Sequence, residues 1–412
     1  MAGRVRHLLV VAGARDVTEV LRKVQPDLAV TAMVASCRLA KVRFPEACAR
    51  VVAVDESAPC REWVALARCV HSLTPLQAVG AFGEFDQDKA AAIADALGLP
   101  FHPPEVIAAV YDKVLMRRRL REAGTEDVPS AVVGSAGELA DFGDRNGFPL
   151  IIKPRNGTGS RAVVKLSSLD EVAGGFARAV RAAGAEYPAL MAERYLEGRE
   201  ISVEAFSEHG IHRILGITDK STDGNFVEMG HTVRAPAADD AQVVHYVARV
   251  LDALGITDGP SHTELILTAA GPRTVETHTR AGGDQIPQLL AAVTGIDMVE
   301  LAIRQVLGER VGAALDELLA QPGHAARFGV IRYLAPPRPG RLVSVAHTAE
   351  AAGLPLVTGC TVLKKPGDPL VAPIEDSVDR LAYCTAVAAD RAAATEAAGR
   401  ALSRLTVTVD DR

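Results

Sequence analysis

The chain of 412 residues is long enough for two or three domains, and with 48% hydrophobic but only 4% aromatic residues its core must be mostly aliphatic. A net charge of −6 gives no basic surface for nucleic acid, and no apolar run reaches the roughly 20 residues of a membrane helix. The six cysteines match no zinc or redox spacing, and the apolar run after Arg6 is too short for a signal peptide. We therefore expect a cytoplasmic protein with reduced thiols that binds neither nucleic acid nor a membrane.

Short apolar strands alternate with helical patterns over the first 110 residues. Strands separated by helices predict a parallel sheet with crossover connections. The first turn, VVAGARDVTEV, lacks the G-x-G-x-x-G spacing that holds a pyrophosphate, so we expect no nicotinamide cofactor here. The expected strands are residues 7–12, 28–34, 50–55 and 78–82.

The middle of the chain changes from an α+β pattern to a β-rich one at Glu200, and the β-rich stretch runs to Thr279. Gly124 follows the first helical pattern and suits a C-cap. The proline-rich run APPRPGR marks a boundary before a C-terminal part with short strands. We expect helices over residues 104–124, 135–147, 168–184 and about 377–403.

A lysine and a loop of small residues lie between two expected strands in PLIIKPRNGTGSRAVVKL, residues 149–166. Small residues let backbone N–H groups approach phosphates closely, although this is not a P-loop, because a strand and not a helix follows. An ordinary hairpin with a solvated lysine explains the segment equally well. The candidates for phosphate binding are Lys153, Gly157, Thr158, Gly159 and Ser160.

A second candidate segment is ERYLEGREISVEAF, residues 193–206, in which a strand, a turn at Gly198 and another strand are expected. A strand edge offers backbone donors and acceptors to a flat heterocycle, and a nearby carboxylate can hold ribose hydroxyls. Taken alone, the segment is better explained as a hairpin with solvated acids. The candidates for nucleotide binding are Glu193, Arg194, Tyr195, Leu196 and Glu200.

Two acids and a base occupy the apolar segment SHTELILTAAGPRTVETHTRAGGDQI, residues 261–286. Glu264 and Glu276 lie on opposite sides of an expected turn, so their side chains come about 5 Å apart if they face the same way. Two carboxylates so close are tolerable if they share divalent cations, and Mg²⁺ is commonly held by one or two carboxylates with phosphate oxygens. Arg280 could then meet a transferring phosphoryl group.

In this order, the three segments resemble the ATP-grasp superfamily of carboxylate–amine ligases over roughly residues 105–310. The resemblance implies ATP and Mg²⁺ as cofactors, with Mn²⁺ as an alternative metal. It implies that Lys113, in DKVLMRRRLREAG, and Lys153 contact phosphates and that Glu264 and Glu276 bind the metal. His278 replaces an amide that ligates metal in the family pattern E-x-N-x-R.

The runs GPSHTELILT, HTRAGGDQI and NFVEMGHTVRAP resemble, more closely, bacterial L-amino acid ligases, which join free amino acids into dipeptides. This resemblance implies an N-terminal α/β domain (1–110), a two-lobed ATP-grasp domain (111–325, lid lobe about 128–205), a C-terminal α+β domain (326–412) and a homodimer. An acid at Asp284 is expected to favour an amine-bearing substrate. Lys220 either reaches the phosphates or is solvated. The amino-acid site implied is Glu228, His231, Arg280, Gly282, Gly283 and Asp284.

The implied reaction is phosphorylation of a carboxylate by ATP, followed by attack of an amine on the acyl phosphate. Lys153 and Arg280 would neutralise the developing charge, and Glu228 or His231 would deprotonate or orient the amine. The substrates are two amino acids or a related carboxylate and amine. Three alternatives remain: a ligase or carboxylase acting on a purine precursor or bicarbonate, a non-catalytic nucleotide-binding regulator, and a nicotinamide-dependent oxidoreductase.

Overall fold

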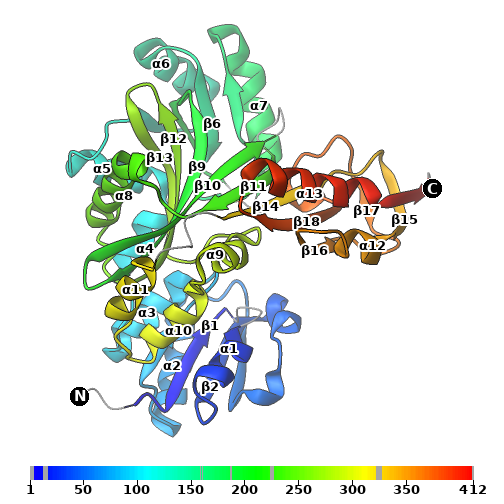
Figure 1. Ribbon diagram of the computed structural model, residues 1–412. Helices are drawn as coiled ribbons and strands as arrows, with labels where there is room; N and C mark the ends of the chain where they lie inside the picture. Colours follow the sequence, from blue (N-terminus) through cyan, green and yellow to red (C-terminus); the bar gives the residue numbers. More distant parts are fainter. Residues whose placement is uncertain are drawn as a thin grey trace.

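The computed structural model describes residues 4–12, 17–157, 159, 161–185, 188–222, 227–321 and 327–410. In Figure 1 the N-terminal sheet lies at the bottom, the small lobe with β6, α6 and α7 at the top, and the C-terminal part to the right of a central sheet. Among the described residues no single helix is long and apolar enough to cross a membrane, although the bent pair Ile286–Thr294 and Met298–Val306 passes by length and composition alone.

The N-terminal domain has a parallel sheet in the order β3-β2-β1-β4, as the alternating pattern predicted. Its two central strands, β1 and β2, are buried on both faces, which explains why they read as continuous apolar runs. One face packs on α2 and α3, and the other packs on α1 and on α10 of the central domain. The elements are β1 (His7–Val11), β2 (Ala29–Ala35), β3 (Arg50–Val54), β4 (Ala78–Gly80), α1 (Val17–Val24), α2 (Cys60–Leu73), α3 (Gln87–Leu97) and α10 (Met298–Val306).

The single helix expected over residues 104–124 is wrong, because Asp112 divides it into α4 (Pro104–Tyr111) and α5 (Lys113–Glu122). The Asp112 carboxylate accepts hydrogen bonds from the amides of Val114 and Leu115, which is N-cap geometry. Gly124 follows α5 with a φ of +62°, as expected of the residue after a helix end.

The small lobe is a four-stranded antiparallel sheet in the order β5-β8-β6-β7, with α6 and α7 packed on it (Figure 1). Both helices fall within the predicted ranges. The elements are β5 (Ser130–Val133), α6 (Ala136–Asn146), β6 (Leu150–Pro154), β7 (Val164–Leu166), α7 (Val172–Ala183) and β8 (Leu190–Arg194).

An eight-stranded antiparallel sheet in the order β13-β12-β9-β10-β11-β14-β18-β16 forms the centre of the molecule. Along β9 the apolar residues Ile201 and Val203 pack on α8, whereas Ser202 and Glu204 point to the opposite face. That polar face carries the candidate site. The other elements of this layer are β9 (Arg199–Glu208), β10 (Ile211–Thr222), β11 (Glu228–Arg234), α8 (Ala241–Leu254), β12 (Gly259–Thr268), β13 (Gly271–His278), α9 (Ile286–Thr294) and α11 (Gly312–Leu319).

The C-terminal part extends the central sheet, so the predicted boundary at residue 326 divides that sheet between β11 and β14. The helix expected over about 377–403 is wrong, because residues 382–388 form β18 between β14 and β16. Small buried side chains suit this paired strand, and strand pairing overrides the helix propensity of alanine. The elements are β14 (Phe328–Leu334), β15 (Gly340–Ala346), α12 (Thr348–Ala352), β16 (Val357–Val362), β17 (Pro369–Leu370), β18 (Ala382–Ala388), α13 (Arg391–Arg404) and β19 (Thr406–Asp410).

Candidate active site

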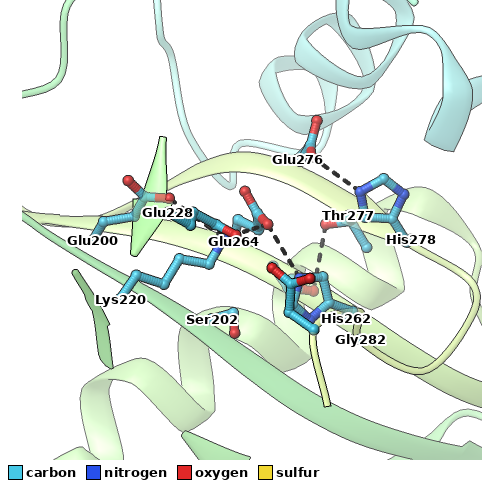
Figure 2. A network of polar contacts seen from close by, with 12 residues as sticks. Glu200, Ser202, Lys220, Glu228, His262, Glu264, Glu276, Thr277, His278 and Gly282 are labelled. Atoms are coloured by element: carbon cyan, nitrogen blue, oxygen red, sulfur yellow. Dashed lines mark hydrogen bonds and ion pairs between the residues drawn. The ribbon is translucent and has the colours of Figure 1, made fainter. Parts of the chain in front are cut away.

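The two predicted metal-binding acids lie directly opposite each other, because Glu264 on β12 and Glu276 on β13 are register partners. Each has a lysine partner: Lys113 Nζ lies 2.7 Å from Glu276 Oε2, and Lys220 forms an ion pair with Glu264 (Figure 2). Burial raises the pKa of both acids, but the lysines, together with neighbouring histidines, outweigh it and hold both pKa values below their usual range. The acids are therefore ionised and close together.

A histidine also contacts each of these acids (Figure 2). His262 Nε2 lies 3.2 Å from Glu264, and His278 Nε2 lies 3.1 Å from Glu276. The opposite ring nitrogens face further carboxylates: Glu204, 2.5 Å from His262 Nδ1, and Glu84, 3.4 Å from His278 Nδ1. Burial lowers the pKa of His262, but Glu204 and Glu264 raise it to about 9, so this histidine adds positive charge beside the acids at neutral pH.

A cavity of about 350 Å³ lies between the small lobe and the central sheet and opens beside the two acids. Most predicted nucleotide-binding residues line it. Arg194 does not, because its side chain donates to the Asn146 carbonyl. Thr158 and Ser160 lie outside the described residues. The lining residues that were predicted are Lys113, Lys153, Gly157, Gly159, Glu193, Tyr195, Leu196, Glu200, Glu264 and Glu276.

Glu193 lines the cavity and also holds two basic side chains, and its contact with the nucleotide stays a prediction. Its carboxylate accepts from Lys153 Nζ at 2.5 Å and from Arg117 at 3.0 and 3.2 Å, and Arg117 also pairs with Glu126 at 2.5 Å. Burial lowers the pKa of Lys153, and Arg117 and Lys113 lower it further, whereas Glu193 opposes this. Glu193 therefore orients Lys153 toward the cavity, and the run MRRRL gave no sign that Arg117 was its partner.

The hairpin interpretation of residues 193–206 is wrong. β8 belongs to the small sheet and β9 to the central sheet, so residues 195–198 connect the two lobes. Tyr195, Leu196 and Gly198 of this connection line the cavity. Gly198 is required by packing, because a Cβ there would lie 2.2 Å from the Leu267 carbonyl oxygen. Burial raises the pKa of Glu200 to about 7, with Glu264 and Glu228 adding to the effect and Lys220 opposing it.

Lys220 is not solvated, since its side chain is 2% exposed and lies among three acids. Its Nζ is 2.5 Å from Glu228 and 3.4 Å from Glu200, in addition to the pair with Glu264. Figure 2 shows Lys220 reaching from β10 between these acids. Lys220 therefore joins the predicted metal-binding acid Glu264 to Glu228 of the candidate amino-acid site.

In that site His231 Nε2 lies 3.3 Å from Asp284 and 3.6 Å from Glu228, as the predicted clustering requires. Arg380, which no sequence pattern singled out, donates to both Asp284 oxygens at 2.8 Å. Asp284 therefore already has a cationic partner, and its preference for an amine-bearing substrate stays a prediction. Gly282 donates its amide to Glu204 at 3.1 Å, and a Cβ on Gly283 would meet nothing within 4 Å.

Arg280 forms an ion pair with Glu84, which comes from the loop after β4 in the N-terminal domain. Burial raises the pKa of Glu84, but His278 and Arg280 outweigh it and lower the pKa to about 2. In this structure the Arg280 guanidinium, which is expected to bind a phosphate or a substrate carboxylate, binds the Glu84 carboxylate instead. Nothing near Glu84 in sequence signals this contact, whereas the alternation in REISVEAF could have indicated Glu204.

Comparisons with known proteins agree with this fold. Residues 146–288 match the family model of the ATP-grasp domain, and residues 332–410 match that of the L-amino acid ligase C-terminal domain 2. A solved L-amino acid ligase from Bacillus licheniformis superposes with a TM-score of 0.84, at 20% sequence identity, over 99% of this chain and 100% of that chain. The predicted ATP-grasp fold is confirmed.

Curated proteins also resemble the chain. It is 28% identical over 311 residues to the uncharacterized protein y4rH of Sinorhizobium fredii, covering 74% of this chain and 63% of that protein. It is 25% identical over 261 residues to dapdiamide A synthase of Enterobacter agglomerans, covering 60% of each. The chain thus spans less than two thirds of the length of these two relatives.

Proposed function

Because the chain is a member of the ATP-grasp superfamily and carries a C-terminal domain of the L-amino acid ligase type, we propose that it is an ATP-dependent ligase that joins two amino acids. The observation that carries the proposal is the continuity of the site. Glu264 and Glu276 border the nucleotide cavity, and Lys220 connects Glu264 to Glu228 of the candidate amino-acid site. Nucleotide and substrates would therefore meet at the paired acids.

The residues present suit Mg²⁺, with Mn²⁺ as the alternative. Glu264 and Glu276 offer carboxylate oxygens from neighbouring strands, and the lysines that pair with them can move to phosphate oxygens. When bound, the metal would offset the negative charge of the phosphates. Both ring nitrogens of His278 face carboxylates, which gives it a role in orienting Glu276.

The other residues have separate tasks in the proposed reaction. Lys113 and Lys153 bind phosphate oxygens, and Arg280 leaves Glu84 to hold the reacting carboxylate. One carboxylate oxygen attacks the γ-phosphorus, so that ADP departs and an acyl phosphate forms. An amine then attacks the acyl carbon, phosphate leaves, and the amine loses a proton.

Glu228 is better placed than His231 to take that proton. The Glu228 side chain is 19% exposed, whereas His231 is fully buried with Nε2 already facing two carboxylates. His231 then orients Glu228 and Asp284. The small lobe excludes water, which would hydrolyse the acyl phosphate.

Phosphate release from MgATP, measured with all pairs of free amino acids and with bicarbonate, tests the proposal. We expect release to depend on a pair and mass spectrometry to find the dipeptide mass. Glu276→Gln should lower the rate by about 10²–10³-fold, as loss of an electrostatic stabiliser typically does. Glu122→Gln, an exposed control on α5, should keep the rate.

Two results would contradict the proposal. Phosphate release with bicarbonate alone would favour a carboxylase. ATP binding without turnover for any pair would favour a regulator. Cytoplasmic location and a homodimer stay predictions, and light scattering tests the second.

A further inference from the structure

We propose that Arg380 determines which side chains the amino-acid site accepts, by neutralising Asp284 and so excluding substrates with a cationic side chain. The inference rests on the proposed function and names its substrate class. It assigns a role in specificity to the C-terminal domain, whose Arg380 reaches the site from the segment before β18.

Four contacts fix the Arg380 guanidinium. Nη1 and Nη2 each donate to one Asp284 oxygen at 2.8 Å, Nη1 also donates to the Glu228 carbonyl at 3.2 Å, and Nε donates to the Ser377 carbonyl at 2.8 Å. The guanidinium carbon lies 3.8 Å from the centre of the Tyr333 ring. With 6% of the residue exposed, this is a buried, bidentate pair of the kind that arginine forms better than lysine.

The pair belongs to the substrate site by direct contacts. Asp284 contacts His231, His231 contacts Glu228, and Glu228 contacts Lys220, which also holds the metal-binding acid Glu264. Beside Asp284, the position of Gly283 borders open space into which a substrate side chain could extend.

Backbone geometry also marks this loop. Asp284 and Gln285 have φ values of 51° and 64°, a left-handed conformation that is uncommon for residues other than glycine. Such strain persists where surrounding contacts hold it and is typical of functional sites. The pair with Arg380 supplies such contacts.

Charge decides what the site accepts. Both Asp284 oxygens are taken by Arg380, and one of them also faces His231. A substrate ammonium group could reach Asp284 only beside the guanidinium, where like charges repel. A neutral side chain meets no such penalty, so neutral amino acids are the expected substrates.

Three variants test this inference with the full-length protein. The measured quantity is the ratio of kcat/KM for lysine or ornithine to that for alanine or serine at each substrate position. Arg380→Met frees Asp284 and should raise the ratio by about 10-fold or more, the value of one charged hydrogen-bonded pair. The double variant Arg380→Met/Asp284→Asn should lose this gain. Asp284→Asn alone leaves Arg380 without its acid and should favour aspartate or glutamate.

Arg400→Met, on the exposed face of α13, is the matched control and should leave the ratio unchanged. If Arg380→Met does not fold, Asp284→Asn, which keeps the size and shape of the side chain, still tests the inference through its expected preference for aspartate or glutamate. An unchanged ratio in a folded, active Arg380→Met, or a wild type that already prefers cationic substrates, would overturn the inference. Absence of ligase activity in the wild type would instead overturn the proposed function.

Discussion

Glu264 and Glu276 show how individual side chains of opposite charge allow two carboxylates to lie close together. Each carboxylate is largely buried, with 17% and 15% of the two side chains exposed, and each is contacted by one lysine and one histidine. The histidines are held in turn by Glu204 and Glu84. Charges alternate outward from the paired acids, so that each of these charged side chains has a partner of opposite sign, as burial of ions requires.

Glu84 gives a prediction at this scale. Its pKa is about 2 in the folded chain, against an ordinary value of 4.5, so its ionisation contributes stability above pH 4.5 that is lost as the pH falls toward 2. A pKa difference of about 2.5 between the unfolded and the folded chain corresponds to about 3 kcal/mol in the free energy of unfolding. Glu84→Gln should therefore destabilise the protein at pH 7, and the difference from wild type should shrink as the pH falls.

Urea unfolding midpoints between pH 7 and pH 3 measure this difference, because the change is expected below pH 4.5. Glu19→Gln, an exposed control paired with Lys23, should stay close to wild type throughout. A Glu84→Gln difference that does not change with pH would show that packing, and not the charge of Glu84, sustains the contact.

At the scale of elements, chain breaks and connections position the site. Asp112 ends α4 and starts α5, which places Lys113 in the first turn of a new helix, 2.7 Å from the Gly157 carbonyl and from Glu276. The connection at residues 195–198 passes from one sheet to the other. Neither feature follows from periodicity, because both depend on which distant element the chain meets.

Asp112→Ala should remove the N-cap of α5 and the partner of Arg155. We expect a loss of stability of about 1–2 kcal/mol from the cap and weaker nucleotide binding, because Lys113 lies directly after it. Differential scanning fluorimetry with and without MgATP measures both effects. Asp95→Ala, at an exposed position of α3, is the control, and equal behaviour of the two variants would argue against the cap.

At the scale of the whole molecule, four parts of the chain contribute to one site. Glu84 comes from the N-terminal domain, Lys153 from the small lobe, and Arg380 from the C-terminal part, while the central sheet supplies the acids. The N-terminal sheet is attached to α10, and β14, β18 and β16 continue the central sheet. The small lobe has a sheet of its own and is linked to the rest by its two connections and by ion pairs such as Arg117 with Glu193 and Arg155 with Asp112, so it is the part expected to move.

We expect the small lobe to close when nucleotide binds. Small-angle X-ray scattering should show a smaller radius of gyration with Mg²⁺ and a non-hydrolysable ATP analogue. Gly198→Ala, which forces a Cβ against the Leu267 carbonyl, should weaken this change and the turnover. No change in the wild type, at concentrations where the analogue binds, would refute a moving lobe.

The sequence by itself determined the parallel N-terminal sheet and the pairing of Glu264 with Glu276, because strand periodicity and a short turn fix side-chain direction locally. It also determined the ATP-grasp fold, through the resemblance of its motifs to that superfamily. Only the tertiary structure decided that residues 382–388 form a strand, that Glu193 holds Lys153, and that Asp284 is neutralised. Those outcomes depend on contacts between distant segments, such as Asp284 with Arg380, 96 residues apart in the chain. Charge pairing between distant segments leaves no periodic signal, since only the packed sheets bring the partners together.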